Sequence, residues 1–351
     1  MTNIKYHYTS LDGLLSILTY KTLRFGHVDM MNDPTELKIG EMFIYDFLRK
    51  RYKTNRFEHK TITNVVNSHR NRDTYIFCMS DVDEDLNQWR VYGDNGSGVQ
   101  LSIDVDNLQS YVNQYLEESM GKASKEGLSI PYFSDNVKQC IYLAKTPNSN
   151  VPFENDNNFY FEFMETDTAK EASKFLSNQW DKHSLDDYFE VASIDGCEMV
   201  VTKNIALQVK GKPIDHKTMF RSVECLSNIE KIVTEFKAIV KDDSYKVENE
   251  HRSIIYADKT NLQFSNQNEF NSEGIYIKDI FTYYKNSYGL SSCIDVPISG
   301  NSGISNVITN IKLGCNSNRG NLKTIQDILK YKWGYLPMDM PTFSESSLRF
   351  R

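Results

Sequence analysis

The sequence has few cysteines, and they form no recognisable pattern. The six are scattered along the chain, with no C-x-x-C pair and no histidine at metal-ligand spacing: Cys78, Cys140, Cys197, Cys225, Cys293 and Cys315. This scatter argues against a structural zinc site and against a disulfide framework. We therefore expect no bound metal and reduced thiols, as in a cytoplasmic protein.

Long apolar runs are also missing. No stretch approaches the length needed to span a membrane, and the first residues, from Met1 to His7, contain no apolar signal core. The net charge of −7 argues against non-specific coating of nucleic acid or of an anionic membrane, although it leaves room for a local basic groove. We therefore expect a cytoplasmic protein with no membrane partner.

The short motifs of several large enzyme families are absent too. The chain has no G-x-x-x-x-G-K-[ST], no G-x-G-x-x-G after an expected strand, no H-E-x-x-H and no G-x-S-x-G. These absences set aside kinase, P-loop, Rossmann and zinc-hydrolase interpretations.

The sequence does contain enough apolar material for a folded core. Of its 351 residues, 40% are hydrophobic and 12% aromatic, and only 8 are prolines. A chain of this length forms either one large domain with an insertion or two smaller domains. We expect a single domain over residues 1–351, in which residues 121–217 form an insertion or lid.

Alternating and helical spacings predict a mixture of short strands and helices. Strands are expected at residues 4–9, 23–26, 75–80, 99–103, 274–284 and 304–314. Helices are expected after Ser10, after Asp33, and over residues 108–116, 169–180, 219–240 and 322–329. Asp33, Pro34 and Glu36 have the spacing of a capping box at a helix start. Antiparallel-looking strands with helices between them indicate an α+β fold rather than a βαβ series.

A basic tract follows the second expected helix. Its cations are interleaved with aromatic residues and are Arg49, Lys50, Arg51, Lys53 and Arg56. Such a tract can follow a phosphate backbone and stack on bases. Cations at the C-terminal end of a helix are also favoured by the helix dipole, and this solvated-surface interpretation carries somewhat more weight.

Two glutamates occur in the segment from Tyr245 to Ile255. We expect this segment to be a strand, so that Glu248, Glu250 and Arg252 share one face. Adjacent carboxylates repel each other, and at least one must be held by a cation or by hydrogen-bond donors, which Arg252 or a ligand could supply. The alternative is a solvated strand face with a paired arginine, the common outcome for an arbitrary Glu-x-Glu.

Four local patterns, in order, resemble a bacterial family known only as a domain of unknown function. They lie at residues 6–18 with 23–25, at 32–36, at 77–80 with 88–93 and 98–99, and at 248–252. Residues 311–314 and 346–351 fit the same pattern. The resemblance covers residues 1–105 and 218–351 and leaves the middle of the chain uncovered.

The first of these patterns is also similar to the opening of DarT-type and other ADP-ribosyltransferase-fold toxins. This similarity implies split mixed and antiparallel β-sheets with flanking helices and a helical insertion. It further implies that NAD binds, as a substrate, in a cleft between the two sheets. His7 would then anchor a ribose hydroxyl, Thr9 or its neighbours would supply a backbone contact, and Tyr8 or another aromatic residue such as Tyr92 would stack on nicotinamide.

The same resemblance makes Glu250 the catalytic carboxylate, with Glu248 upstream of it. Cleavage of the nicotinamide–ribose bond develops positive charge on the ribose, which a fixed carboxylate stabilises. The carboxylate can also hold a ribose hydroxyl or take a proton from the nucleophile. Arg24 or Arg252 would neutralise the pyrophosphate or brace the carboxylate.

Three functions follow from these expectations. The first is an ADP-ribosyltransferase that modifies a macromolecule, with RNA or DNA slightly favoured over protein. It would act as a toxin or anti-phage effector, with an antitoxin or another defence-system protein as a partner. The second is an NAD glycohydrolase that uses the same pocket with water as acceptor. The third is a non-catalytic nucleotide-sensing or nucleic-acid-sensing module of a defence system.

Overall fold

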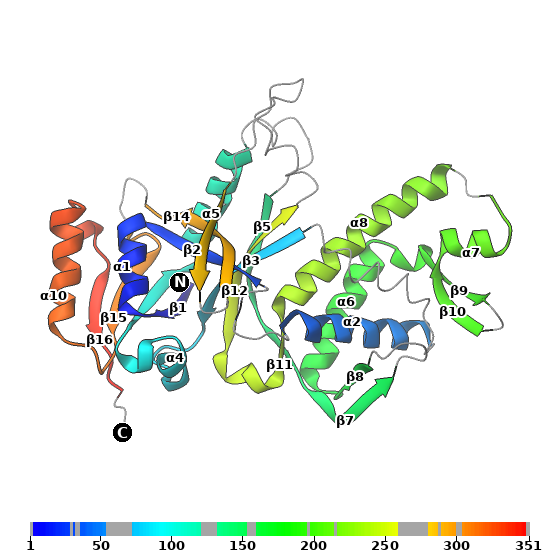
Figure 1. Ribbon diagram of the computed structural model, residues 1–351, viewed down its shortest axis with the longest axis horizontal. Helices are drawn as coiled ribbons and strands as arrows, with labels where there is room; N and C mark the ends of the chain where they lie inside the picture. Colours follow the sequence, from blue (N-terminus) through cyan, green and yellow to red (C-terminus); the bar gives the residue numbers. More distant parts are fainter. Residues whose placement is uncertain are drawn as a thin grey trace, which may run out of the picture. The chain divides into compact units, whose positions relative to one another are not determined.

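The chain divides into two compact units in its computed structural model (Figure 1). The first unit comprises Met1–Met30, Thr74–Cys140 and Val247–Arg351, and the second comprises Met31–Asp73 and Ile141–Lys246. The expected insertion at 121–217 is thus shared between the units. The structure describes residues 3–28, 31, 36–53, 72–120, 132–152, 159–194, 197–213, 216–258, 280–286, 289–299 and 304–348.

A ten-stranded sheet forms the framework of the first unit. Followed along the sheet, eight of its strands are β13 (Phe281–Asn286), β14 (Gly289–Pro297), β2 (Thr22–His27), β3 (Arg72–Ser80), β1 (Ile4–Thr9), β4 (Val99–Asp104), β15 (Ile308–Leu313) and β16 (Thr342–Glu345). The other two are β12 (Glu250–Asp258), which pairs with β3, and β5 (Tyr132–Gln139), which pairs with β12. The strand pair β15–β16 is parallel, whereas β1–β4 and β2–β14 are antiparallel, so the sheet is mixed.

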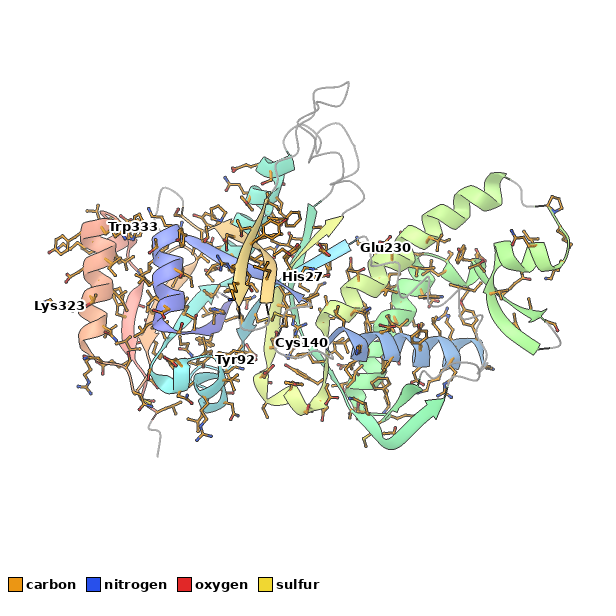
Figure 2. All side chains as sticks on the ribbon, in the orientation of Figure 1. His27, Tyr92, Cys140, Glu230, Lys323 and Trp333 are labelled. Atoms are coloured by element: carbon orange, nitrogen blue, oxygen red, sulfur yellow. The ribbon has the colours of Figure 1, made fainter. Side chains whose placement is uncertain are left out.

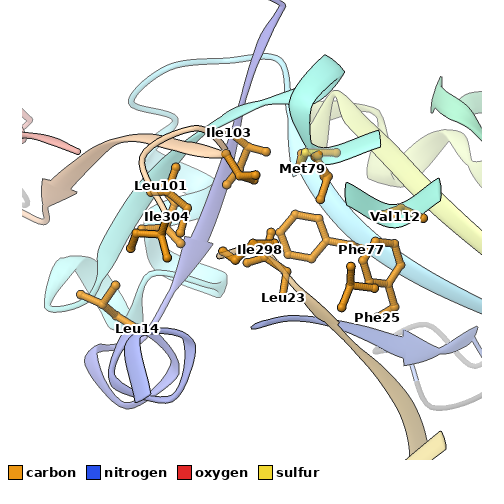
Figure 3. Packing of buried hydrophobic residues seen from close by; sticks show 14 of the residues in the cluster. Leu14, Leu23, Phe25, Phe77, Met79, Leu101, Ile103, Val112, Ile298 and Ile304 are labelled. Atoms are coloured by element: carbon orange, nitrogen blue, oxygen red, sulfur yellow. The ribbon is translucent and has the colours of Figure 1, made fainter. Parts of the chain in front are cut away.

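Among the described residues, three helices pack on one face of this sheet. They are α1 (Leu11–Tyr20), α5 (Val105–Met120) and α10 (Gly320–Asp327), and Figure 1 shows α10 beside β16. The Ser10 hydroxyl caps α1 by accepting a hydrogen bond of 3.0 Å from the Gly13 N–H. Figure 3 shows how Leu14 of α1 and Val112 of α5 join apolar strand residues in one core. Burial of this continuous apolar surface is the main stabilising contribution to the unit.

Strands β1 and β3 meet at only one registered pair, Tyr6 with Ser80. Strand β1 otherwise pairs along its length with β4, while β3 pairs with β2 through Gly26 and His27. The sheet therefore forks at this point into β13-β14-β2-β3-β12-β5 and β1-β4-β15-β16. The expected α+β class, with a mixed sheet and several helices, is confirmed. Its assignment to the ADP-ribosyltransferase fold stays a prediction.

Strand alternation gives the two faces of the sheet opposite characters. The core residues Phe25, Phe77 and Leu101 lie on the face that the three helices cover. The residues next to them along the strands, including Arg24 and Gln100, point to the opposite face. That second face is rich in polar side chains, and it is where polar ligands would meet hydrogen-bonding partners.

Two glycines allow the short helix α4 (Leu86–Val91) and the turn after it to pack closely on the polar face. A Cβ on Gly314 would collide with the Gly96 carbonyl oxygen, and a Cβ on Gly98 would collide with the Thr9 carbonyl oxygen. Because backbone atoms cannot move aside cheaply, these positions require glycine. Trp89 of α4, which is fully buried, lies in the space so formed.

We expect Gly314→Ala to lower the free energy of unfolding by about 1–3 kcal/mol, the usual cost of overpacking. Gly26→Ala is the matched control in the same sheet, because the nearest atom to its added Cβ is the Tyr284 hydroxyl at 3.8 Å. The measurement is the urea midpoint of each variant. Equal midpoints for the two alanine variants would contradict the packing argument.

The second unit combines helices with small sheets. Its helices are α2 (Glu36–Tyr52), α6 (Asp167–Lys182), α7 (Lys203–Val209) and α8 (His216–Ile239). Its strands pair as β6 (Ile141–Leu143) with β11 (Val240–Asp242), β7 (Lys145–Pro152) with β8 (Phe159–Phe163), and β9 (Phe189–Ile194) with β10 (Cys197–Thr202). Phe43 of α2 contacts Phe163 and Phe236, with ring centroids 5.1 and 5.7 Å away, so α2 and α8 share one core.

The structure corrects several expectations about elements. The segment from Tyr245 does not start as a strand: residues Asp243–Glu248 form a 3-10 helix, and β12 begins only at Glu250. Strand β4 was expected to be half-buried, but all six of its residues are buried, and on its polar face Gln100 donates a hydrogen bond to the Tyr8 hydroxyl. Strand β14 was not expected at all. The capping residues Asp33 and Pro34 lie outside the described residues.

Candidate functional site

Glu250 and Arg252, at the start of β12, form a buried ion pair. The Arg252 Nε donates to Glu250 Oε1 at 2.8 Å, and its Nη2 donates to Oε2 at 3.3 Å. Arg252 is fully buried and Glu250 is 6% exposed. The two side chains are two positions apart on β12 and therefore lie on the same face of the strand. Ile255 and Ala257, at the alternate positions of β12, belong to the core on the other face. Arg252 therefore braces the Glu250 carboxylate, which is one of the two roles expected for Arg24 or Arg252.

Glu248 lies outside the strand and is more accessible than Glu250. Its Oε1 accepts a hydrogen bond of 3.0 Å from the hydroxyl of Tyr92, the residue that follows α4 (Figure 2). Asn249, between the glutamates, has a left-handed backbone with a φ of 43°. This turn breaks the alternation, so the expectation that Glu248 shares a strand face with Glu250 and Arg252 is wrong.

The turn that presents Glu248 is held at three successive carbonyl groups. The Glu248 carbonyl accepts from Ser80 Oγ at 3.0 Å and from Gln88 Nε2 at 3.3 Å. The Asn249 carbonyl accepts from the Asp81 N–H at 3.1 Å, and the Glu250 carbonyl accepts from the Cys140 N–H at 2.9 Å. The backbone beneath the Glu248 carboxylate is therefore fixed by β3, α4 and the end of β5.

Ser80 and Gln88 were not among the expected site residues. Both lie inside the motifs that carry the family resemblance, at residues 77–80 and 88–93. Gln88 is positioned by α4, whose first turn is capped by the Asp85 carboxylate accepting from the Asn87 and Gln88 N–H groups. The clustering of motifs was thus the only signal that pointed to them.

Tyr8 is a structural residue of the core. It is 5% exposed and packs edge-on against Trp89, with ring centroids 5.1 Å apart. Its hydroxyl accepts from Gln100 Nε2 at 2.8 Å and from the Asp85 N–H at 2.9 Å, and it donates to the Val82 carbonyl at 3.2 Å. Burial raises the pKa of Tyr8 to about 12. Its ring has no free face for stacking on nicotinamide, so Tyr92 is the better of the two expected aromatic residues.

His7 lies at the fork of the sheet. Its Nδ1 is 2.8 Å from the Cys78 carbonyl, and its ring stacks on Phe77 with centroids 4.5 Å apart. Because a carbonyl only accepts, Nδ1 must carry the proton, which leaves Nε2 as an acceptor. Burial lowers the pKa of His7, so the neutral ring is favoured. Strand alternation puts this side chain on the apolar face, opposite Glu250.

The other expected cofactor-binding residues also lie on opposite faces of the sheet. Thr9 belongs by alternation to the face of His7, and its hydroxyl packs against Gly13 at the start of α1. Arg24 is on the polar face and makes a bidentate pair with Asp295, through Nε–Oδ1 at 2.8 Å and Nη2–Oδ2 at 3.0 Å. The Arg24 guanidinium also lies 4.8 Å from the centroid of the Tyr284 ring.

Three cations of the basic tract are paired with acids within the second unit. Arg49 and Lys50 contact the two carboxylate oxygens of Asp46 at 2.8 and 2.9 Å. Arg51 Nε contacts Asp186 Oδ1 at 2.9 Å. Lys53 is exposed, and Arg56 lies outside the described residues. This pairing favours the alternative interpretation, in which the tract is a solvated helix end rather than a nucleic-acid site.

We expect Arg51→Gln to destabilise the second unit by about 1 kcal/mol, because it removes a network of surface ion pairs. Lys53→Gln, which changes the same charge at an exposed position two residues away, should have no measurable effect. Thermal unfolding of both variants is the test. A larger effect of either substitution on oligonucleotide affinity than on stability would restore the nucleic-acid interpretation of this tract.

A family model described as a protein of unknown function (DUF2971) matches part of the chain. The match covers residues 88–253, so the expected resemblance to a domain of unknown function is confirmed over that range. The matched range includes the middle of the chain, which the motifs had left uncovered, and ends just after the Glu250–Arg252 pair. No curated protein and no solved structure matches the chain.

Two further observations concern only the residues that the structure describes. None of the helices there combines the length and the apolar character needed to cross a membrane. In that same part of the chain, no three His, Cys, Asp or Glu side chains gather in an arrangement that could hold a metal ion.

Proposed function

We propose that this chain cleaves the bond between nicotinamide and ribose in NAD and transfers ADP-ribose to a macromolecule. The observation that carries the proposal is the Glu248 carboxylate, which the Tyr92 hydroxyl orients on a turn held by Ser80 and Gln88. A carboxylate fixed in this way stabilises the positive charge that develops on the ribose as nicotinamide leaves. The motif resemblance to ADP-ribosyltransferase-fold toxins supplies the substrate.

The proposed roles of the two glutamates differ from those implied by the resemblance. Glu250 is buried and already neutralised by Arg252, so it has a structural part in the proposal and supports the turn from below. Glu248 takes the catalytic part, because its carboxylate is less buried than that of Glu250 and is oriented by the Tyr92 hydroxyl. Tyr92 is then a positioning residue that acts through Glu248.

The proposed reaction balances without any further reagent. Nicotinamide leaves with the electron pair of the glycosidic bond, and an oxygen or nitrogen of the acceptor forms the new bond to the ribose carbon. The proton of the acceptor passes to the Glu248 carboxylate or to water. Water in place of the acceptor would give free ADP-ribose, which is the glycohydrolase alternative on the same site.

The polar face of the sheet would bind the remainder of the substrate. Arg24 has five N–H donors in a planar fork, of which Asp295 takes two, and such a fork suits a pyrophosphate. His7 has no part in this proposal, since it lies on the apolar face. In a cell, the activity would suit a toxin or an anti-phage effector held in check by a partner protein.

The test uses NAD labelled in its ADP-ribose part, the purified chain, and separate preparations of RNA, DNA and protein from a bacterial extract. We expect label on a macromolecule, with nucleic acid favoured. Label only in free ADP-ribose would replace the transferase by the glycohydrolase. NAD that is intact after incubation with every preparation would refute the proposal.

A further inference from the structure

We infer that the first unit carries a binding surface for single-stranded nucleic acid, formed by the segment after α10 and the end of α1. We call it the Tyr331 surface, and its residues are Lys21, Lys330, Tyr331, Lys332, Trp333 and Tyr335. Cations alternate with aromatic rings along this segment. Binding itself does not depend on the proposed NAD reaction, whereas use of the bound strand as acceptor would rest on it.

The backbone of this segment is unusual and leaves Lys330, Tyr331 and Lys332 exposed, whereas Trp333 and Tyr335 pack in part against the core. Residues Ile328–Lys332 form a π-helix, a rare element that occurs often at functional sites. Gly334 follows with a left-handed φ of 68°, which ends the helix. Tyr331 is 72% exposed, so its ring is available for stacking on a base.

Each lysine of the surface lies over an aromatic ring. Lys21 Nζ is 4.4 Å from the centroid of the Trp333 ring and 5.3 Å from that of Tyr335. Lys332 Nζ lies 5.4 Å from the Trp333 ring, and Lys330 Nζ lies 5.0 Å from the Tyr331 ring. Trp333 marks this position at the end of the α10 region, beside α1, in Figure 2. These contacts hold positive charge next to flat apolar faces.

The charge of these lysines is not neutralised within the described part of the chain. None of Lys21, Lys330 and Lys332 forms an ion pair with a described carboxylate, although many other described cations do. The contrast with the basic tract is direct, because Arg49, Lys50 and Arg51 are all paired with aspartates. Unpaired lysines beside aromatic rings suit an anionic polymer that also offers flat rings, which single-stranded nucleic acid does.

Two other partners are less compatible with this chemistry. An anionic membrane would use the lysines and the exposed side chains of Leu336 and Met338, but it offers no flat rings to stack on Tyr331. A protein partner would bury those two apolar side chains and would not need three unpaired lysines. Membrane binding is kept as an outcome of the test.

The test is fluorescence anisotropy of a labelled mixed-sequence single-stranded RNA, and of the matching DNA, with the full chain and no NAD. We expect Tyr331→Ala to weaken binding roughly tenfold or more, the loss of one stacked base. Lys330→Ala combined with Lys332→Ala should flatten the slope of log K against log salt by about 1.4, since each phosphate contact on a single strand contributes about 0.7. Circular dichroism establishes that each variant is folded.

Matched controls come from other exposed positions. Tyr283→Ala removes a tyrosine that is 74% exposed on β13, and Lys174→Ala removes an exposed lysine on α6. Both should leave affinity and salt slope unchanged. Absence of RNA and DNA binding, equal losses in the control variants, or binding to phosphatidylserine vesicles with none to oligonucleotides would overturn the inference. If the unmodified chain binds oligonucleotides but does not turn over NAD, only the proposed function is refuted.

Discussion

Replacement of Glu250 by alanine should lower the free energy of unfolding by about 3–5 kcal/mol, because it leaves the Arg252 guanidinium buried without its carboxylate. Arg252 is fully buried, and both of its contacts to Glu250 would be lost at once. Glu250→Gln should be milder, since the amide oxygen still accepts one hydrogen bond. Urea unfolding of the first unit measures both effects.

A double-mutant cycle separates the pair from its surroundings. Arg252→Met alone should also destabilise the protein, since it leaves the buried Glu250 carboxylate without its cation. Arg252→Met combined with Glu250→Leu instead replaces the pair by apolar groups of similar size. The combined variant should regain most of the lost stability, as buried ion pairs exchanged for apolar residues often do. If Glu250→Gln leaves stability unchanged and abolishes NAD turnover, Glu250 is the catalytic residue and the structural role assigned to it is wrong.

The strands and helices were largely predictable because local patterns determine them. Ser10 and the apolar spacing after it predicted α1, and the alternation at Val99, Leu101 and Ile103 predicted β4. What the pattern could not reveal was coverage of the second face of β4. That burial involves residues from distant parts of the chain, such as Tyr8, whose hydroxyl accepts a hydrogen bond from Gln100.

The candidate site was only partly predictable. The pairing of Glu250 with Arg252 follows from a spacing of two on a strand, and the sequence contains that spacing. The separation of Glu248 from these two residues does not follow from the spacing, because it depends on the left-handed turn at Asn249. Asparagine tolerates a left-handed conformation but does not require it, so its presence does not predict the turn. The contact of Glu248 with Tyr92 joins residues 156 positions apart, and only the folded sheet brings them together.

Replacement of Glu248 by glutamine should reduce NAD cleavage by about 100–1000-fold, the usual loss when one preorganised electrostatic group of an active site is removed. Glutamine keeps the size of the side chain and an oxygen that can accept from the Tyr92 hydroxyl, so the fold should be intact. The loss should appear in kcat with little change in KM, because the carboxylate interacts with charge that exists only in the transition state. Steady-state kinetics over a range of NAD concentrations measures both.

Tyr92→Phe provides the graded companion to this substitution. Its loss of one hydrogen bond of 3.0 Å to Glu248 should reduce kcat by roughly tenfold, since the carboxylate keeps its charge but not its orientation. Because Tyr92 acts through Glu248, the double variant should be no slower than Glu248→Gln alone. Independent, multiplicative losses would show that Tyr92 contacts the substrate directly, as a ring stacked on nicotinamide would. Full activity of Glu248→Gln would exclude a catalytic role for this carboxylate and would refute the proposed mechanism.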